Sequence, residues 1–173
     1  FLFGTSAFAA PSSVTTGSIQ LIQVKNETAE VPASIQGVTG TVDLQAGTGE
    51  LTIPINAWDS ALKVRDNNVR GTFFQAAEHP TATFTLASLT LQDGVGTAKG
   101  TLKMFSGSVP VEASVKVTTD EAGVTTVQTT APFSVSISGL GLSDNLTALM
   151  KLCAHKSVTD AVNAQVSLTL AQP

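Results

Sequence analysis

One stretch of sequence decides the fold, Thr97-Ala-Lys-Gly-Thr-Leu-Lys-Met-Phe-Ser-Gly-Ser-Val-Pro-Val-Glu-Ala-Ser-Val-Lys-Val117. Apolar and polar residues alternate along both of its halves, residues 97–105 and 109–117. Strict alternation is typical of a β-strand that buries one face. The Ser106-Gly107 pair between the halves is typical of a tight turn. The stretch therefore predicts an antiparallel hairpin with one apolar face.

The same alternation extends outward from this hairpin through most of the chain. It recurs at residues 50–57, 81–88, 131–137 and 164–170, and more weakly at 18–25 and 37–44. Short turn segments containing glycine separate several of these runs. Pro54 lacks an amide hydrogen, so we expect an edge strand or a bulge at residues 50–57. The pattern predicts an all-β domain of about eight antiparallel strands, which leaves a sandwich and a closed barrel as the two architectures.

Two segments interrupt the alternation. Residues 61–77 space their apolar side chains more like helical turns than like a strand. Residues 142–158 begin with Ser143-Asp144-Asn145, which is typical of a helix start, and continue with an apolar stripe. We therefore expect one or two short helices, with the second closing one end of a barrel.

Composition excludes several classes of protein. The chain has 173 residues, with 9 Lys and Arg against 13 Asp and Glu, which gives a formal charge of −4. No basic run is present, so the chain lacks the electrostatic signature of a nucleic-acid binder. The single cysteine, Cys153, excludes an internal disulfide and a multi-cysteine metal site. We expect no metal site and no required cofactor.

The sequence gives little support for catalysis. The sequence contains no Gly-x-Ser-x-Gly nucleophile elbow, no phosphate-binding loop and no His-Glu-x-x-His zinc-protease motif. Cys153 and His155 are two residues apart, and on a helix such neighbours point in very different directions. We interpret them as a core cysteine beside an exposed histidine, and we expect a protein that is not an enzyme.

The beginning of the chain has a different character from the rest. Residues 1–10 are apolar and uncharged, and Ala7-Phe8-Ala9 fits a signal-peptide cleavage site. Pro11-Ser12-Ser13 follows and completes a segment at 1–13. We interpret them as a signal-peptide remnant or an apolar N-terminal tail, followed by one barrel domain at 14–173. No stretch approaches the ~20 apolar residues of a membrane span, so we expect a periplasmic or secreted protein. Residues 1–10 are also a candidate for self-association.

Several motifs resemble the YceI-like family of exported lipid-binding proteins. They are Val64-Arg65-Asp66-Asn67-Asn68-Val69-Arg70, Phe73-Phe74, His79-Pro80-Thr81-Ala82-Thr83-Phe84, Gly100-Thr101-Leu102-Lys103-Met104, Gly107-Ser108-Val109-Pro110-Val111 and Val158-Thr159-Asp160-Ala161-Val162. The matches run from about residue 37 to 170. The resemblance implies a lipocalin-like antiparallel barrel whose apolar lumen holds a long isoprenoid, either a polyprenyl phosphate-type lipid or an isoprenoid quinone.

The inward rows of such a barrel predict the wall of the lumen. Small side chains at Ala82, Ala98, Gly100, Ala113, Ala131 and Ala164 leave volume unfilled. The alternative is that Phe73, Phe74, Phe84, Phe105 and Phe133 fill this volume as an ordinary core. Given the resemblance, the predicted ligand-binding residues are Phe73, Phe74, Phe84, Leu86, Leu102, Met104, Val111, Ala113, Val115, Phe133, Val135, Ile137, Val166 and Leu168.

A cluster of charged and polar residues, Arg65, Asp66, Asn68 and Arg70, admits two interpretations. An arginine there offers planar paired donors to a head group at the barrel mouth. Alternatively, Arg65 or Arg70 pairs with Asp66 or with backbone carbonyls and pins the long connection, which is the interpretation we favour. Asn68 stands where the family often has histidine, and the uncharged Ser136-Ile137-Ser138-Gly139 replaces a basic residue. These departures favour a neutral head group such as a quinone, or no head contact.

Two functions from different classes follow. The first is a binding protein that carries or sequesters an isoprenoid lipid in the barrel lumen. The second is a structural protein that dimerises or polymerises when its apolar N-terminal segment adds as a strand to a neighbour's sheet.

Overall fold

The chain is described here by a computed structural model, which places residues 10–171. The long strands are β1 (Ser12–Lys25), β2 (Ala29–Gln36), β4 (Thr48–Pro54), β6 (Thr81–Gln92), β7 (Val95–Met104), β8 (Gly107–Thr119) and β11 (Val158–Leu170). The shorter strands are β3 (Thr39–Asp43), β5 (Trp58–Asp59), β9 (Thr125–Thr129) and β10 (Phe133–Ser136). The helices are α1 (Lys63–Asn68), which continues into the π-helical turn η2 (Val69–Phe73), and α2 (Ser143–Leu152), and a 3-10 turn η1 covers Ile55–Ala57.

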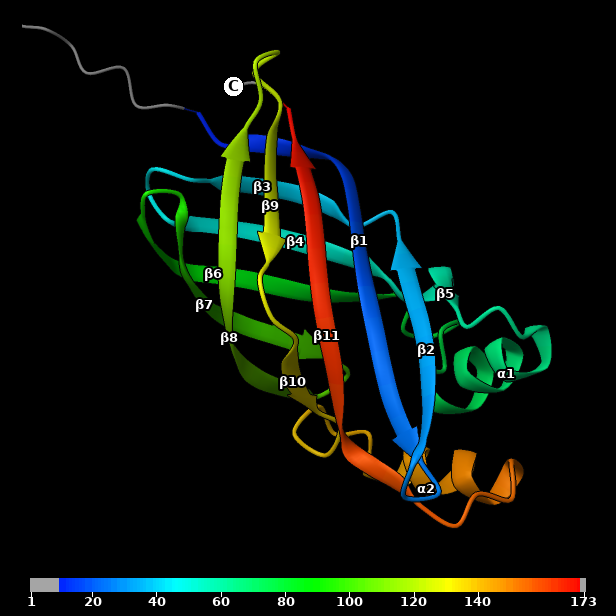
Figure 1. Ribbon diagram of the computed structural model, residues 1–173. Coiled ribbons are helices and arrows are strands. Elements are labelled where there is room, and N and C mark those ends of the chain that lie inside the picture. The colour runs from blue at the N-terminus through cyan, green and yellow to red at the C-terminus, as the bar shows by residue number, and fades with distance from the viewer. Residues whose placement is uncertain (1–9, 172–173) are drawn as a thin grey trace, which may run out of the picture.

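The strands form one closed antiparallel barrel (Figure 1). The sheet order is β10-β11-β9-β8-β7-β6-β4-β3-β1-β2-β5, and a further pairing of β11 with β1 closes it. Every strand pair is antiparallel, as the hairpin at residues 97–117 predicts. The prediction of an antiparallel barrel of about eight strands with two short helices is confirmed, and short extra strands are added to it.

Three strands are absent from the sequence-based prediction, namely β2, β5 and β9, and β5 has only two residues. β2 contains Pro32 between its inward residues Val31 and Ala33, and a proline within a run argues against a strand. β9 has only one apolar residue, Val127, among threonines and a glutamine, so its alternation is too weak to detect.

The expectation of an edge strand or bulge at Pro54 is wrong. β4 lies between β3 and β6 with a continuous register on both sides. Pro54 is the last residue of β4, where the chain leaves the ladder and begins the turn η1. Its missing amide hydrogen therefore interrupts no bond inside the strand.

A bulge in β6 extends the apolar face of that strand. The register with β7 shifts between Leu86 and Ser88, so one extra residue is inserted there. Before the insertion the side chains at even-numbered positions point into the barrel, and after it those at odd-numbered positions do. As a result Leu86 and Leu89 both line the interior, and β6 continues four residues beyond the predicted end at 88.

The two helices lie at one end of the barrel, opposite the β8–β9 turn (Figure 1). Asn145 at the start of α2 donates a hydrogen bond from Nδ2 to the Phe73 carbonyl, at 2.7 Å. Leu142 and Leu146 are buried against the core. The prediction that the second helical segment covers one end of the barrel is consistent with this arrangement.

Asp160 attaches the connection between β10 and α2 to β11. Its carboxylate accepts hydrogen bonds from Ser136 Oγ at 2.8 Å, Ser138 Oγ at 2.9 Å and the Ser138 backbone N–H at 2.8 Å. Burial raises the pKa of Asp160, but these three bonds together outweigh it and hold the pKa below its usual value. The serines that replace a basic residue therefore hold a loop in place.

Candidate functional site

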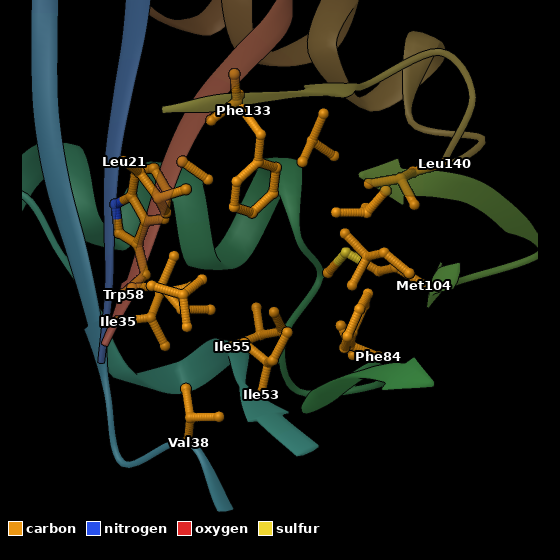
Figure 2. Close-up of a pocket in the computed structure, with 18 of the residues that line it drawn as sticks. Leu21, Ile35, Val38, Ile53, Ile55, Trp58, Phe84, Met104, Phe133 and Leu140 are labelled. Atoms are coloured by element: carbon orange, nitrogen blue, oxygen red, sulfur yellow. The ribbon is translucent and has the colours of Figure 1, made fainter. Parts of the chain in front are cut away.

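A cavity of about 280 Å³ lies inside the barrel, and its wall is almost entirely hydrocarbon. Figure 2 shows side chains from strands on different sides of the barrel, including Ile35, Ile53, Phe84 and Phe133, directed toward a common interior. The drawn side chains carry no oxygen, and their only heteroatoms are the indole nitrogen of Trp58 and the sulfur of Met104. An apolar molecule can be buried against such a wall without leaving polar groups of the protein unsatisfied.

Every residue predicted to bind the ligand lies on this wall. These residues are Phe73, Phe74, Phe84, Leu86, Leu102, Met104, Val111, Ala113, Val115, Phe133, Val135, Ile137, Val166 and Leu168. The placement follows from strand geometry, because the inward row of each strand faces the barrel axis. The wall also includes β1, β2 and β4 residues that the prediction left out, among them Leu21, Ile35 and Ile53.

Small side chains keep part of the interior open. Ala82, Ala98, Ala113 and Ala164 line the cavity on four different strands. Gly100 lies under the ring of Phe84, and a Cβ at this position would approach that ring to 2.5 Å. The absence of a side chain at Gly100 therefore leaves room for the Phe84 ring to pack against the sheet.

The prediction that Ala131 faces the lumen is wrong. Ala131 is exposed and lies in the connection between β9 and β10, because β10 begins only at Phe133. Phe105 also lies off the wall, where its ring packs on His79 with centroids 4.0 Å apart. Phe73, Phe74, Phe84 and Phe133 line the cavity without filling it.

The charged and polar residues at 65–70 have different roles: some hold the connection in place, and one lies on the cavity wall. Asp66 is 5% exposed and is the one buried charged residue in the described part of the chain. Its Oδ1 accepts hydrogen bonds from the Ser60 N–H at 2.8 Å and the Ser60 hydroxyl at 2.6 Å. Arg70 donates to two backbone carbonyls, those of Asp66 at 3.3 Å and Asn56 at 3.1 Å. Asp66 and Arg70 therefore pin the connection between β5 and β6.

The remaining members have other surroundings. Asn68 donates from Nδ2 to Cys153 Sγ at 3.6 Å, which joins the end of α1 to the end of α2. Arg65 lies on the cavity wall, and no ion pair joins it to Asp66. Among residues 10–171 the single ion pair is that of Lys99 and Glu112, which are both exposed.

Replacing Asp66 by Ala should lower stability and leave ligand binding unchanged. The substitution strands the Ser60 N–H and hydroxyl, and each group left without a partner costs about 1–3 kcal/mol. Urea unfolding measures the free energy of unfolding, and ligand content per folded molecule is measured in parallel. Asp144→Ala is the control, because Asp144 is exposed in the first turn of α2. Unchanged stability with lost ligand would instead make Asp66 part of a head-group clamp.

Polar residues gather at one end of the cavity, and the sequence prediction missed most of them. The inward row of β1 runs from Ile19 and Leu21 to Gln23 and Lys25. Arg65 and His155 line the same cavity. Burial lowers the pKa of His155, and the charges of Lys25 and then Arg65 lower it further, which places all three side chains near one another. His155 is half-buried on the wall, so its interpretation as a simply exposed residue is wrong.

The described residues show neither a metal cluster nor a spanning helix. Within residues 10–171, no three His, Cys, Asp or Glu side chains come together as a possible metal site. None of the helices in this part of the chain has the length and apolar character needed to cross a membrane.

Comparisons with known proteins agree with this architecture. The family model described as the YceI-like domain matches residues 9–170. A polyisoprenoid binding domain from Saccharophagus degradans, implicated in plant cell wall breakdown, superposes with a TM-score of 0.81 at 19% identity, covering 95% of this chain and 99% of that one.

Two further solved structures share the fold. BcnA from Burkholderia cenocepacia gives a TM-score of 0.70 at 16% identity, covering 90% of this chain and 96% of that one. The YCEI protein of Campylobacter jejuni gives 0.64 at 16% identity, covering 84% and 87%. A search of curated proteins gave no match.

Proposed function

The chain belongs to the YceI-like family, and from this premise we propose that it binds a long isoprenoid lipid, a polyprenyl compound or an isoprenoid quinone, with the chain of the lipid inside the barrel. The observation that carries the proposal is the hydrocarbon wall of the cavity. Burial of apolar surface is worth about 0.8 kcal/mol per CH₂. A branched hydrocarbon chain gains this energy here without losing hydrogen bonds.

The structural comparison supports the same ligand class. The Saccharophagus degradans protein, which shares the fold, is described as a polyisoprenoid binding domain. We infer that the present chain carries or sequesters its lipid in the periplasm or outside the cell, and that it acts by binding and not by catalysis.

The alternative role, assembly through the N-terminal segment, depends on residues 1–9, which lie outside the described residues. The first described strand, β1, is paired with β2, β3 and β11 within its own barrel. No described contact therefore favours assembly over lipid binding.

Mass spectrometry of an organic extract tests the proposal directly. The full chain is purified without detergent and extracted, and the extract is compared with that of an unrelated protein prepared in the same way. We expect an isoprenoid species in near-equimolar amount. If no isoprenoid is found, and the delipidated protein takes none up from vesicles that contain polyprenyl lipid or quinone, the proposal is wrong.

A further inference from the structure

Three large apolar side chains are exposed at the end of the barrel where the two helices lie. Leu62 precedes α1 and is 49% exposed, Val64 in the first turn of α1 is 68% exposed, and Leu152 at the end of α2 is 56% exposed. A single exposed leucine or valine is common on protein surfaces, but a group of them bordered by polar residues is typical of an interaction site. We call these three residues the apolar rim.

A contact between the helices brings the members of the apolar rim to one place. Val64 and Asn68 are four residues apart in α1, so they lie on the same side of that helix. Asn68 donates from Nδ2 to Sγ of Cys153, the residue that follows Leu152. Figure 1 shows both helices at this end of the barrel. The exposed residues of α1 and α2 therefore flank one junction.

The apolar rim adjoins the cavity. Arg65 follows Val64, Cys153 follows Leu152, and both Arg65 and Cys153 line the cavity wall. In both segments an exposed apolar residue is thus followed directly by a residue of the wall. A lipid that enters or leaves the cavity between α1 and α2 passes the rim.

The exposed charge next to the rim residues is positive. Lys63 lies between the first two rim residues, and Lys151 immediately precedes the third. Neither lysine has an ion-pair partner among residues 10–171. The acidic residues of the same segments are placed differently, because Asp66 is buried, Asp144 lies in the first turn of α2, and Asp59 lies before the rim and accepts a hydrogen bond within the turn that leads to α1.

The opposite end of the barrel has exposed apolar residues with acidic neighbours. Val95 is 47% exposed beside the β6–β7 turn, and Val124 is 38% exposed in the β8–β9 turn. The first turn contains Asp93 and the second contains Asp120 and Glu121, and neither contains a lysine or arginine. The two ends therefore differ in charge more than in apolar character. An anionic surface attracts the end with the helices and repels the other.

Resting on the proposed function, we propose that the apolar rim docks on the surface of an anionic phospholipid membrane, with the helical end of the barrel facing the bilayer while a lipid enters or leaves. The apolar side chains of the rim insert at the boundary between head groups and acyl chains, and the lysines beside them contact the anionic head groups.

The composition of the rim favours a membrane over a protein as the partner. Lysine is depleted in protein–protein interfaces, where burial of its ammonium group is costly. Segments that lie on membranes combine aliphatic side chains with lysines, because the ammonium group stays in the hydrated head-group layer. The alternation of Leu62, Lys63 and Val64, and the pair Lys151 and Leu152, have this second composition.

Co-sedimentation with lipid vesicles tests the inference. The delipidated full-length protein is mixed with vesicles of phosphatidylcholine alone, or of phosphatidylcholine with an equal share of phosphatidylglycerol, in both cases without any isoprenoid. A lysine close to an anionic lipid surface strengthens binding by about fivefold. With two such lysines we expect at least about tenfold tighter binding to the vesicles with phosphatidylglycerol, and the difference should shrink in high salt.

Two double variants test the apolar part of the rim. Val64→Gln with Leu152→Gln should weaken binding to the anionic vesicles by at least about tenfold, because two aliphatic side chains no longer enter the bilayer. Val95→Gln with Val124→Gln is the matched control at the opposite end of the barrel and should bind as the original protein does. All four side chains are exposed, so both variants should keep the original melting temperature.

Two further double variants test the charge. Lys63→Gln with Lys151→Gln should remove most of the preference for phosphatidylglycerol. Lys99→Gln with Lys116→Gln removes the same charge from exposed positions on the outer face of β7 and β8, and should keep that preference.

The rate of lipid transfer gives a readout that a merely structural role of the rim would not move. In the Val64→Gln, Leu152→Gln variant, transfer of geranylgeraniol from anionic vesicles to the protein should be several-fold slower. The amount bound at equilibrium should be unchanged, because the rim is in contact with the membrane only during transfer.

The outcomes separate the two proposals. Equal binding to both kinds of vesicle, undiminished binding of the rim variants, or an equal loss in their controls overturns membrane docking and leaves isoprenoid binding intact. Failure of the original protein to bind geranylgeraniol added in solution overturns the proposed function, whatever the vesicle experiments give.

Discussion

Replacing Ala113 by Phe should abolish most isoprenoid uptake while the barrel remains folded. Ala113 is 7% exposed on β8, faces the cavity and lies opposite Ala98 of β7 in the strand register. A phenyl ring at this position extends into space that the lipid chain needs. We expect uptake from vesicles to fall by more than about tenfold, since several CH₂ groups lose contacts worth ~0.8 kcal/mol each.

Stability distinguishes this effect from unfolding. An added ring in a filled core costs about 1–3 kcal/mol through overpacking. In an open cavity the ring gains burial instead, so the melting temperature of Ala113→Phe should be unchanged or higher. Ala131→Phe is the control, because Ala131 is exposed and lies off the cavity wall. A raised melting temperature together with undiminished uptake would show that the lipid binds elsewhere.

Affinity should rise steeply with the number of isoprene units in the ligand. Each unit adds five carbons, for which burial is worth up to about 4 kcal/mol, although ordering of the chain offsets much of this sum. We expect at least about tenfold tighter binding per unit along a series of prenyl alcohols until the cavity is filled. Fluorescence displacement or calorimetry measures the series, and the uncharged alcohols should show little dependence on salt.

The same series contains its own control. In the Ala113→Phe variant the affinity should stop rising at a shorter prenyl alcohol, because the phenyl ring occupies part of the cavity. If affinity is the same from the two-unit to the longest alcohol, the hydrocarbon chain does not lie in the barrel.

The wall of the cavity could be predicted from the sequence because of one simple relation. Side chains in a strand alternate between the two faces, so the parity of an apolar run maps directly onto inside and outside. Phe84, Leu102 and Val111 were located in this way, and all of them line the cavity. Alternation does not predict the facing of a residue that lies before the start of a strand or beyond a bulge. Ala131 precedes β10, and Leu89 reaches the wall only through the bulge in β6.

The polar end could not be predicted by the same reasoning. The sequence marks Arg65 as a charged residue, but its environment depends on how α1 is positioned relative to β1 and the segment after α2. Lys25 carried one available signal, since it has the same parity as Ile19 and Leu21. His155 carried none, because it lies outside any regular element. The sequence predicts that Arg65 or Arg70 pairs with Asp66 or with backbone carbonyls. Arg70 donates to backbone carbonyls, and Ser60 supplies the hydrogen bonds of the Asp66 carboxylate.

The position of the basic residues, in connections and at a strand end, has a consequence for how such a protein can vary in sequence. Arg65 and His155 belong to segments inserted between strands, and Lys25 is the last residue of β1, so all three lie in connections or at a strand end. Loops and strand ends tolerate substitution and changes in length better than the elements they connect. Substitutions at this end can therefore change the polar groups that line the cavity while the apolar wall formed by the strands is kept.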